Sequence, residues 1–304
     1  MSELREQVLF IQAGDGFIPD GIRGEGFLVE KPFYEKGLLL RLIREAWFRL
    51  HLPFKELFYN KRVLEFEGEY LIVRDPQITR AYLQWLQKQG RWKLFFFYDN
   101  MVGRARHIYP HQIPDGIDVW TYDRHDSEKY GIKLNDRMSY YMSFCKEKQE
   151  AEYDVLYVGR DKGRGEFLYA LEKALNDAGL RTFFRIVGDT RFEKKKDKRY
   201  GPEMSYSEIC ELIARSKAIL NVILPGQEGM TMRDSEAICN NVKLITTNSA
   251  ILNNPFYRPG NMLAITGIEV DKIKVFLEQP YEPYDESVKE SFLLEKWVEK
   301  MVTE

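Results

Sequence analysis

The stretch YVGRDKGRG, residues 157–165, joins an apolar segment at 153–158 to a helical pattern at 166–178. A buried strand that passes through a glycine-rich loop into a helix is the βα unit of a parallel sheet. Glycine lets the backbone of such a loop approach an anion, and the first turn of the helix adds partial positive charge. The stretch therefore predicts an α/β fold with a phosphate-binding loop, although a charged surface turn would have a similar composition.

Strands and helices alternate through the rest of the chain as well. In the second half the apolar pattern predicts strands at 182–187, 218–224 and 243–246, helices at 205–215 and 232–240, and a last helix at 287–302. In the first half it predicts strands at 8–11, 71–73, 93–98 and 118–122, and helices at 36–50 and 77–88. This alternation predicts a mainly parallel sheet in each half.

The charged segment Lys146–Glu150 has no strand signal and separates the two arrays. We therefore expect a fold of two α/β, Rossmann-like domains that face a cleft: an N-terminal, acceptor-side domain at 1–150 and a C-terminal donor domain at 151–285. Residues 286–304 would form a C-terminal helix, for which packing back on the N-terminal domain is one option. Ligands of such sheets bind at the carboxyl ends of the strands.

Composition narrows the classes of function. The chain has 304 residues, of which 44% are hydrophobic and 30% are charged, and its net charge is -2. Such a chain is typical of soluble globular proteins and has no whole-molecule field that would select nucleic acid or a membrane. Three widely spaced cysteines and four scattered histidines predict no disulfide framework, no metal site and a reducing, cytoplasmic setting; the cysteines are Cys145, Cys210 and Cys239.

A second informative stretch, EGMTMRDSEA, begins at Glu228. Thr231 followed by Asp234 three residues later is a capping arrangement for a helix that starts near Met232. The carboxylates of Glu228 and Glu236 then lie before and inside this helix, where they could accept hydrogen bonds from the hydroxyl groups of a sugar and a ribose. The alternative is a capped surface helix whose acidic residues are only solvated.

The sequence EGMTMRDSEAICNNVKLI at 228–245 resembles the E-x7-E segment of GT-B glycosyltransferases, which typically reads EGFGLxxxEAMAxGxPVI. The GRxxxKG loop of that group is similar to the shorter Gly159–Gly163 stretch. Its strand ending in G-D/E is similar to Ile186–Asp189. The resemblance covers about residues 153–250, whereas the N-terminal half resembles the group only in its alternation of strands and helices.

The resemblance implies a role for each matching residue. Arg160 and Lys162 would bind the donor diphosphate, Glu228 the hydroxyl groups of the transferred sugar, and Glu236 the ribose. The main chain at Thr231 and Met232 would approach the phosphates. Other residues expected at the substrate site are Gly159, Arg164, Gly188, Asp189, Gly229, Met230 and Arg233, with Gly14 and Gly16 in the loop after the first strand of the N-terminal half.

Several positions depart from the pattern of the group. Thr231 stands where a second glycine is usual, Asn241 where a glycine ends the helix, and Lys243 where a proline is usual. Asparagine tolerates the left-handed conformation that such a helix end needs. Because the loop after Gly159 is short, either Lys162 or Arg164 could fill the lysine position of the group.

The function implied is transfer of a sugar from a nucleotide diphosphate sugar to a hydroxyl of a glycan or lipid-linked acceptor. The resemblance implies retention of anomeric configuration, no metal and no cofactor, and a role in bacterial surface-polysaccharide synthesis. Fixed cations would then neutralise the leaving diphosphate. Two alternatives stay open: another nucleotide-sugar enzyme such as an epimerase or a sugar phosphorylase, and a non-catalytic partner in glycan assembly.

Three further features allow two interpretations each. His107 follows the strand at 93–98 and is a candidate acceptor-site or catalytic residue, or a surface histidine on a loop. The helix at 36–50 either buries its apolar face in the core or rests on an anionic membrane through its arginines. The basic run at 194–199 reads as a solvated loop or, alternatively, as a contact for phospholipid or nucleotide.

Overall fold

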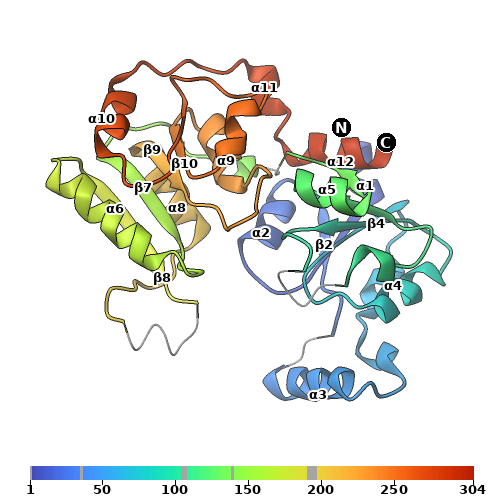
Figure 1. Cartoon of the computed structure of the whole chain (residues 1–304). Helices are drawn as coiled ribbons and strands as arrows, with labels where there is room; N and C mark the ends of the chain where they lie inside the picture. The colour runs from blue at the N-terminus through green and yellow to red at the C-terminus, as the bar shows by residue number, and fades with distance from the viewer. Residues whose placement is uncertain (1, 35–36, 104–107, 138–139, 190–196) are drawn as a thin grey trace. The chain divides into compact units, whose positions relative to one another are not determined.

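The computed structural model describes residues 2–34, 37–103, 108–137, 140–189 and 197–304. The chain forms two compact units (Figure 1). Unit 1 comprises Met1–Asp136 together with Val298–Glu304, and unit 2 comprises Arg137–Trp297. Each unit contains one parallel sheet with helices, so the α/β architecture expected from the alternating pattern is confirmed.

Unit 1 contains a six-stranded parallel sheet in the order β2-β1-β3-β4-β5-β6. Its strands are β1 Val8–Gln12, β2 Leu28–Glu30, β3 Tyr70–Arg74, β4 Lys93–Tyr98, β5 Asp118–Thr121 and β6 Lys133–Leu134. Its α-helices are α1 Ser2–Gln7, α2 Phe17–Gly24, α3 Gly37–Arg49, α4 Arg80–Gln87 and α5 Arg124–Tyr130, and it also holds the 3-10 helices η1 Lys55–Phe58, η2 Lys61–Glu65 and η3 Pro110–Gln112.

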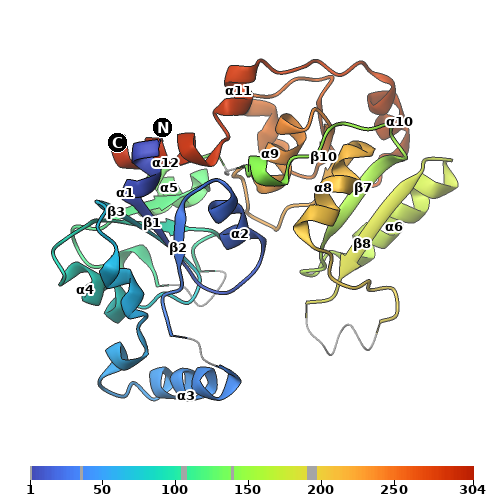
Figure 2. The same ribbon diagram turned by 180° about the vertical axis from the view of Figure 1, so that it is seen from behind.

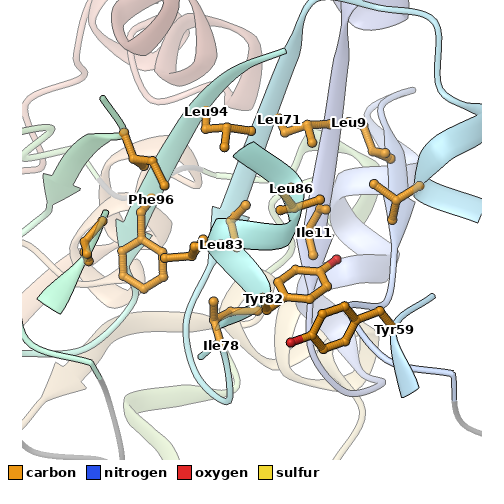
Figure 3. Packing of buried hydrophobic residues seen from close by; sticks show 14 of the residues in the cluster. Leu9, Ile11, Tyr59, Leu71, Ile78, Tyr82, Leu83, Leu86, Leu94 and Phe96 are labelled. Atoms are coloured by element: carbon orange, nitrogen blue, oxygen red, sulfur yellow. The ribbon is translucent and has the colours of Figure 1, made fainter. Parts of the chain in front are cut away.

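The core of unit 1 lies between its central strands and α4 (Figure 3). Thr79 caps α4 by accepting a hydrogen bond from the Tyr82 backbone N–H at 3.2 Å. Leu83 and Leu86 follow on the buried face of the same helix. They pack with alternate residues of the strands, including Leu9, Ile11, Leu71, Val73, Leu94 and Phe96. Alternation along each strand therefore places one set of side chains beneath this helix.

Unit 2 contains a five-stranded parallel sheet in the order β11-β10-β9-β7-β8. Its strands are β7 Tyr153–Arg160, β8 Thr182–Val187, β9 Ser216–Asn221, β10 Lys243–Thr246 and β11 Met262–Ala264. Its α-helices are α6 Gly165–Asp177, α8 Tyr206–Ala214, α9 Met232–Cys239, α10 Val270–Glu278, α11 Glu286–Glu290 and α12 Leu294–Thr303, the last of which continues into unit 1, with the 3-10 helices η4 Met142–Phe144 and η5 Ser249–Asn253.

Both faces of the unit 2 sheet are buried (Figure 2). Val155 and Tyr157 of β7 belong to a core with α6 and α10, whereas Leu156 and Val158 belong to a core with α8 and α9. Strands of a parallel sheet that is covered twice read as continuous apolar runs. This explains why the segment at 153–158 was readable from its sequence.

Two expectations about single elements need correction. The last helix predicted at 287–302 is divided into α11 and α12, separated at residues 291–293. The helix predicted at 36–50 exists as α3, but it does not bury its apolar face. Leu39 and Leu42 are 71% and 53% exposed, and Arg44 is the residue of α3 that is buried.

Some elements left no clear sequence signal, namely α1, α2, β2, α5, β6, α10 and β11. Most of them are short, and β2, β6 and β11 are edge strands of two or three residues. A periodic pattern needs more residues than such elements contain. The proposed boundary segment Lys146–Glu150 has no regular secondary structure, and its Lys148 donates a hydrogen bond to the carbonyl oxygen of Ser216 at 2.6 Å.

Lys243 explains one departure from the glycosyltransferase pattern. Its side chain is buried, and its Nζ donates to the carbonyl oxygens of Phe276 and Gln279, each at 2.6 Å. These carbonyls lie at the C-terminal end of α10, where backbone acceptors commonly bind side chains. Lysine at this position therefore joins β10 to α10, and burial lowers the pKa of its ammonium group.

Candidate functional site

The candidate site is built from three loops of unit 2 that follow adjacent strands. Gly159 and Arg160 are the last two residues of β7, Gly188 and Asp189 follow β8, and the segment 228–233 contains the end of the β9–α9 loop and the first two residues of α9. Because β8, β7 and β9 are neighbours in a parallel sheet, their carboxyl ends meet at one edge. The predicted residues of the C-terminal half therefore gather at the edge where ligands of such sheets bind.

Two exposed cationic residues lie at the end of β7 and in the loop that follows it. The Arg160 side chain is 47% exposed, and its Nη2 donates to Glu203 Oε1 at 2.9 Å. Lys162 is exposed and adopts a left-handed backbone with φ 47°. Its backbone N–H donates to Asp189 Oδ2 at 2.7 Å, which joins this loop to the end of β8. The arrangement holds both cations at the sheet edge.

Arg164 stabilises the shape of the same loop. Its guanidinium donates to the carbonyl oxygens of Arg160 at 2.8 Å, Asp161 at 3.0 Å and Val222. The Arg164 side chain thus binds three backbone carbonyl oxygens, which lie at or just after the ends of β7 and β9. Of the two candidates for the lysine position, Lys162 is the one whose side chain is exposed, and the main contacts of Arg164 are with the protein backbone.

Asp161 caps the start of α6. Its Oδ1 accepts from the Gly165 backbone N–H at 2.6 Å, and its Oδ2 accepts from the Tyr200 hydroxyl. Partial burial alone would raise the pKa of Asp161, but these hydrogen bonds favour the ionised form and hold it below its usual range. A carboxylate therefore already occupies part of the helix start that the sequence suggested for phosphate.

The start of α9 has the predicted capping box. The Thr231 hydroxyl accepts from the Arg233 backbone N–H at 3.2 Å, and Asp234 Oδ2 accepts from the Thr231 backbone N–H at 2.5 Å. The Asn221 amide at the end of β9 donates to Asp234 Oδ2 at 3.2 Å. Burial raises the pKa of Asp234 to about 6, against the opposing effect of these hydrogen bonds.

Glu236 forms a buried polar cluster with Arg233 and Tyr206. Its Oε1 accepts from the Tyr206 hydroxyl at 2.7 Å, and its Oε2 accepts from Arg233 Nη1 at 2.7 Å. Arg233 Nη2 also donates to the carbonyl oxygen of Val158 at 2.5 Å. Glu236 is 2% exposed. Both carboxylate oxygens of Glu236 thus have protein partners in this structure. The ribose contact assigned to Glu236 by resemblance stays a prediction.

Glu228 differs from Glu236 in that it is exposed. Its backbone carbonyl accepts from the Asn248 amide at 3.1 Å, which anchors the loop before α9. Gly229 and Met230 are buried, and the Met230 side chain packs in the core beneath α9. A ligand contact by Met230 would therefore involve its main chain, and the sugar contact assigned to Glu228 by resemblance stays a prediction.

The predicted residues of the N-terminal half belong to unit 1. Gly14 and Gly16 lie in the loop from β1 to α2 with φ of 83° and 128°, a region that residues with a Cβ rarely adopt. Between them, Asp15 pairs with Lys31 at 2.7 Å. His107 lies outside the residues that the structure describes, and so does the part of the basic run at 194–196.

The sequence did not reveal the role of Tyr206. A capping box of Ser205 and Glu208 marks the start of α8, and Tyr206 is its first residue. Nothing in that local pattern shows that the phenol reaches a carboxylate 30 residues later. Within the described ranges, His, Cys, Asp and Glu side chains form no group of three or more that could hold a metal ion.

No family model matches the chain, and no curated protein matches it. The solved structures that are similar to it include three that cover 97% of its length. A sucrose-phosphate synthase from Thermosynechococcus elongatus has 10% sequence identity and a TM-score of 0.57, with 97% of that chain covered.

The other two structures have lower TM-scores. A DNA-modifying β-glucosyltransferase, solved with and without uridine diphosphoglucose, has 11% identity, a TM-score of 0.44 and 94% of its chain covered. A putative UDP-N-acetylglucosamine 2-epimerase from Listeria monocytogenes has 8% identity, a TM-score of 0.46 and 94% of its chain covered. At these identities the likeness concerns the fold. With its two parallel α/β units, the chain has the GT-B fold.

Proposed function

We propose that this protein is a glycosyltransferase that uses a nucleotide diphosphate sugar held by unit 2. The observation that carries the proposal is that exposed Arg160 and Lys162, at the end of β7 and in the loop after it, and exposed Glu228, in the loop after β9, follow two neighbouring strands of one sheet. Arg164 and Asp189 help to shape these loops, through hydrogen bonds to the Arg160 carbonyl oxygen and the Lys162 backbone N–H. Two cations and one carboxylate on loops that follow neighbouring strands match the charges and hydroxyl groups of a diphosphate that carries a sugar.

The proposed chemistry follows from these charges. Arg160 and Lys162 would bind the diphosphate and stabilise the negative charge that develops on it as the sugar leaves. Glu228 would accept hydrogen bonds from hydroxyl groups of the transferred sugar. In a retaining transfer the leaving phosphate takes the proton of the acceptor hydroxyl. We propose that the reaction needs no metal, because fixed side chains offset the leaving charge.

The acceptor and the setting belong to the same proposal. We propose a hydroxyl of a glycan or a lipid-linked glycan as the acceptor, and a cytoplasmic role in assembling bacterial surface polysaccharide. The GT-B fold and its likeness to a sucrose-phosphate synthase support a sugar-transfer reaction as the class. The resemblance of residues 228–245 to the E-x7-E segment supports the assignment of the donor to unit 2.

The decisive experiment is nucleotide binding by variants of the β7–α6 loop. Arg160→Ala and Lys162→Ala should each weaken binding of a nucleoside diphosphate by about 1.5 to 3 kcal/mol, the usual effect of losing a charge-assisted hydrogen bond. The matched control is Lys173→Ala on the exposed side of α6, where Lys173 pairs with Asp177. Isothermal titration across a panel of nucleoside diphosphates gives the affinities and identifies the base.

Two outcomes would contradict the proposal. One is the absence of binding by any nucleoside diphosphate to the unaltered chain. The other is equal affinity in Arg160→Ala, Lys162→Ala and Lys173→Ala, which would place the anion elsewhere. Product analysis then distinguishes transfer from epimerisation, since only transfer joins the sugar to an acceptor and releases a free nucleoside diphosphate.

A further inference from the structure

Helix α3 of unit 1 presents its apolar side chains to solvent. Leu38 and Leu39 are each 71% exposed, and Leu42 and Ile43 are 53% and 42% exposed. In Figures 1 and 2, α3 stands apart from the sheet of unit 1. Soluble proteins rarely expose a contiguous apolar surface of this kind unless it contacts a partner or a membrane.

The residues that attach α3 to unit 1 lie on one side of the helix and leave the leucines on the other side. The Arg44 guanidinium lies 4.5 Å from the centroid of the Phe33 ring, and Phe48 packs edge-on against Phe33 with ring centroids 5.5 Å apart. Residues 44 and 48 are one turn apart, so they define the side that is attached to unit 1. Leu39, Leu42 and Ala46 then lie on the opposite side at helical spacing.

The apolar surface continues beyond the helix. Leu50, Phe54 and Leu57 are 69%, 66% and 70% exposed in the segment that leads through η1. A groove of about 900 Å³ lies between α3 and the loop after β3. The residues that line this groove include Leu42, Phe48, Arg49, Gln77, Ile78 and Thr79. The exposed side chains of α3 and this segment therefore form one region, which we call the α3 surface.

The α3 surface lies in a basic stretch of the chain. Residues 37–62 contain six Lys or Arg and two Glu, a net charge of +4 in a chain whose total is -2, and +3 when the buried Arg44 is left out. Arg49 at the end of α3 is exposed, and so are Lys61 and Arg62, which follow η1 in the chain. Apolar side chains bordered by Lys and Arg are the signature of a helix that lies in the interface of an anionic bilayer.

We propose that the α3 surface docks unit 1 on an anionic lipid bilayer. Thirteen residues make a helix about 20 Å long, which suits a position parallel to the surface. Among the described residues, no helix has the length and apolar character to cross a membrane. A second copy of the chain fits the surface less well, since a two-fold contact would bring like charges together.

Docking deepens the proposed function by favouring a lipid-linked acceptor, which resides at such a surface. The docking itself does not depend on sugar transfer. Vesicle binding and nucleotide binding are measured separately on the same full-length chain, so either can fail without the other. The exposed position of the leucines also means that their replacement should leave the fold intact.

The test is co-sedimentation with vesicles of phosphatidylcholine alone and of phosphatidylcholine mixed with phosphatidylglycerol. The unaltered chain should bind the anionic vesicles, and more salt should weaken that binding by screening. Leu39→Ser with Leu42→Ser should lower the partition coefficient at least about tenfold. The matched control replaces exposed apolar residues of unit 2, as Leu252→Ser with Val275→Ser, and should bind like the parent; these residues are 50% and 59% exposed.

A charge variant completes the design. Arg49→Glu with Lys61→Glu should reduce binding to the anionic vesicles, whereas Lys173→Glu on α6 should not. The proposal is overturned if the parent does not bind anionic vesicles or if the Leu39→Ser, Leu42→Ser variant binds them like the parent. Concentration-dependent dimerisation that this variant abolishes, without any vesicle binding, would assign the surface to a second copy instead.

Discussion

Helices α9 and α3 both depart from the usual distribution of residues: α9 buries polar side chains, and α3 exposes apolar ones. In α9 the residues Asp234, Ser235 and Glu236 are buried, and in α3 a series of leucines is exposed. Asp234 and Glu236 of α9 are hydrogen-bonded to other elements of unit 2, whereas Leu39 and Leu42 of α3 are 71% and 53% exposed. A buried carboxylate with partners orders a site, and an exposed leucine row indicates a surface that is covered in use.

The largest effect is expected from breaking the buried pair in α9. Glu236→Ala removes the partner of the mostly buried Arg233 and of the Tyr206 hydroxyl. An unpaired buried charge costs about 3 to 5 kcal/mol of unfolding free energy. Urea denaturation measures this loss. The double variant Arg233→Met, Glu236→Leu should be more stable than Glu236→Ala, and equal stability of the two would mean that the pair is not the cause.

The exposed carboxylate should behave differently from the buried one. Glu228→Gln should lower kcat by about tenfold to a hundredfold, as expected when a charge-assisted bond that strengthens in the transition state is weakened. Nucleotide affinity should change little, because Glu228 is proposed to contact the sugar and not the nucleotide. The unfolding free energy should also change little, because Glu228 is exposed. Steady-state kinetics with nucleotide titration test this. Parent-like turnover would remove Glu228 from the sugar site.

The capping carboxylate of α9 should make stability depend on pH. Burial raises the pKa of Asp234 to about 6 in the folded chain, against about 4 when unfolded. Between these values the folded state holds a proton that the unfolded state has lost, so this residue's contribution to the unfolding free energy falls as pH rises. The slope is at most about 1.4 kcal/mol per pH unit.

Asp234→Asn isolates that contribution. The difference in unfolding free energy between parent and variant should change between pH 4 and 6 in the direction stated, and should be flat above that window. Denaturant titrations at several pH values measure it. A pH-independent difference would show that Asp234 titrates normally. Other carboxyl groups cancel in the comparison because both proteins contain them.

The smallest effect on stability is expected at the α3 surface. Leu39→Ser with Leu42→Ser should alter the unfolding free energy by no more than about 0.5 kcal/mol per residue, as is usual for exposed positions. Leu171→Ala in α6 provides the contrast, because Leu171 is fully buried and such a change costs about 2 to 5 kcal/mol. A large loss in the α3 variant would mean that these leucines are buried in the folded chain.

Much of the fold could be predicted from local sequence. The strand, loop and helix at 153–178 are readable because apolar spacing repeats over many residues. The Thr231–Asp234 capping box and the left-handed Asn241, with φ 52°, were also expected and are confirmed. Each depends on interactions within about four residues, so the neighbouring sequence contains the information.

Only the tertiary structure decided which side of α3 faces the protein and what Glu236 contacts. The spacing of Leu39, Leu42 and Ala46 indicates an apolar face of a helix, but the spacing alone cannot show whether that face is buried in the folded protein. Arg44 and Phe48 settle it by packing on Phe33, a residue from before the helix. Likewise Tyr206 meets Glu236, and Lys243 meets the end of α10, across about 30 residues of chain. Such contacts depend on how separate elements pack, which local propensity does not encode.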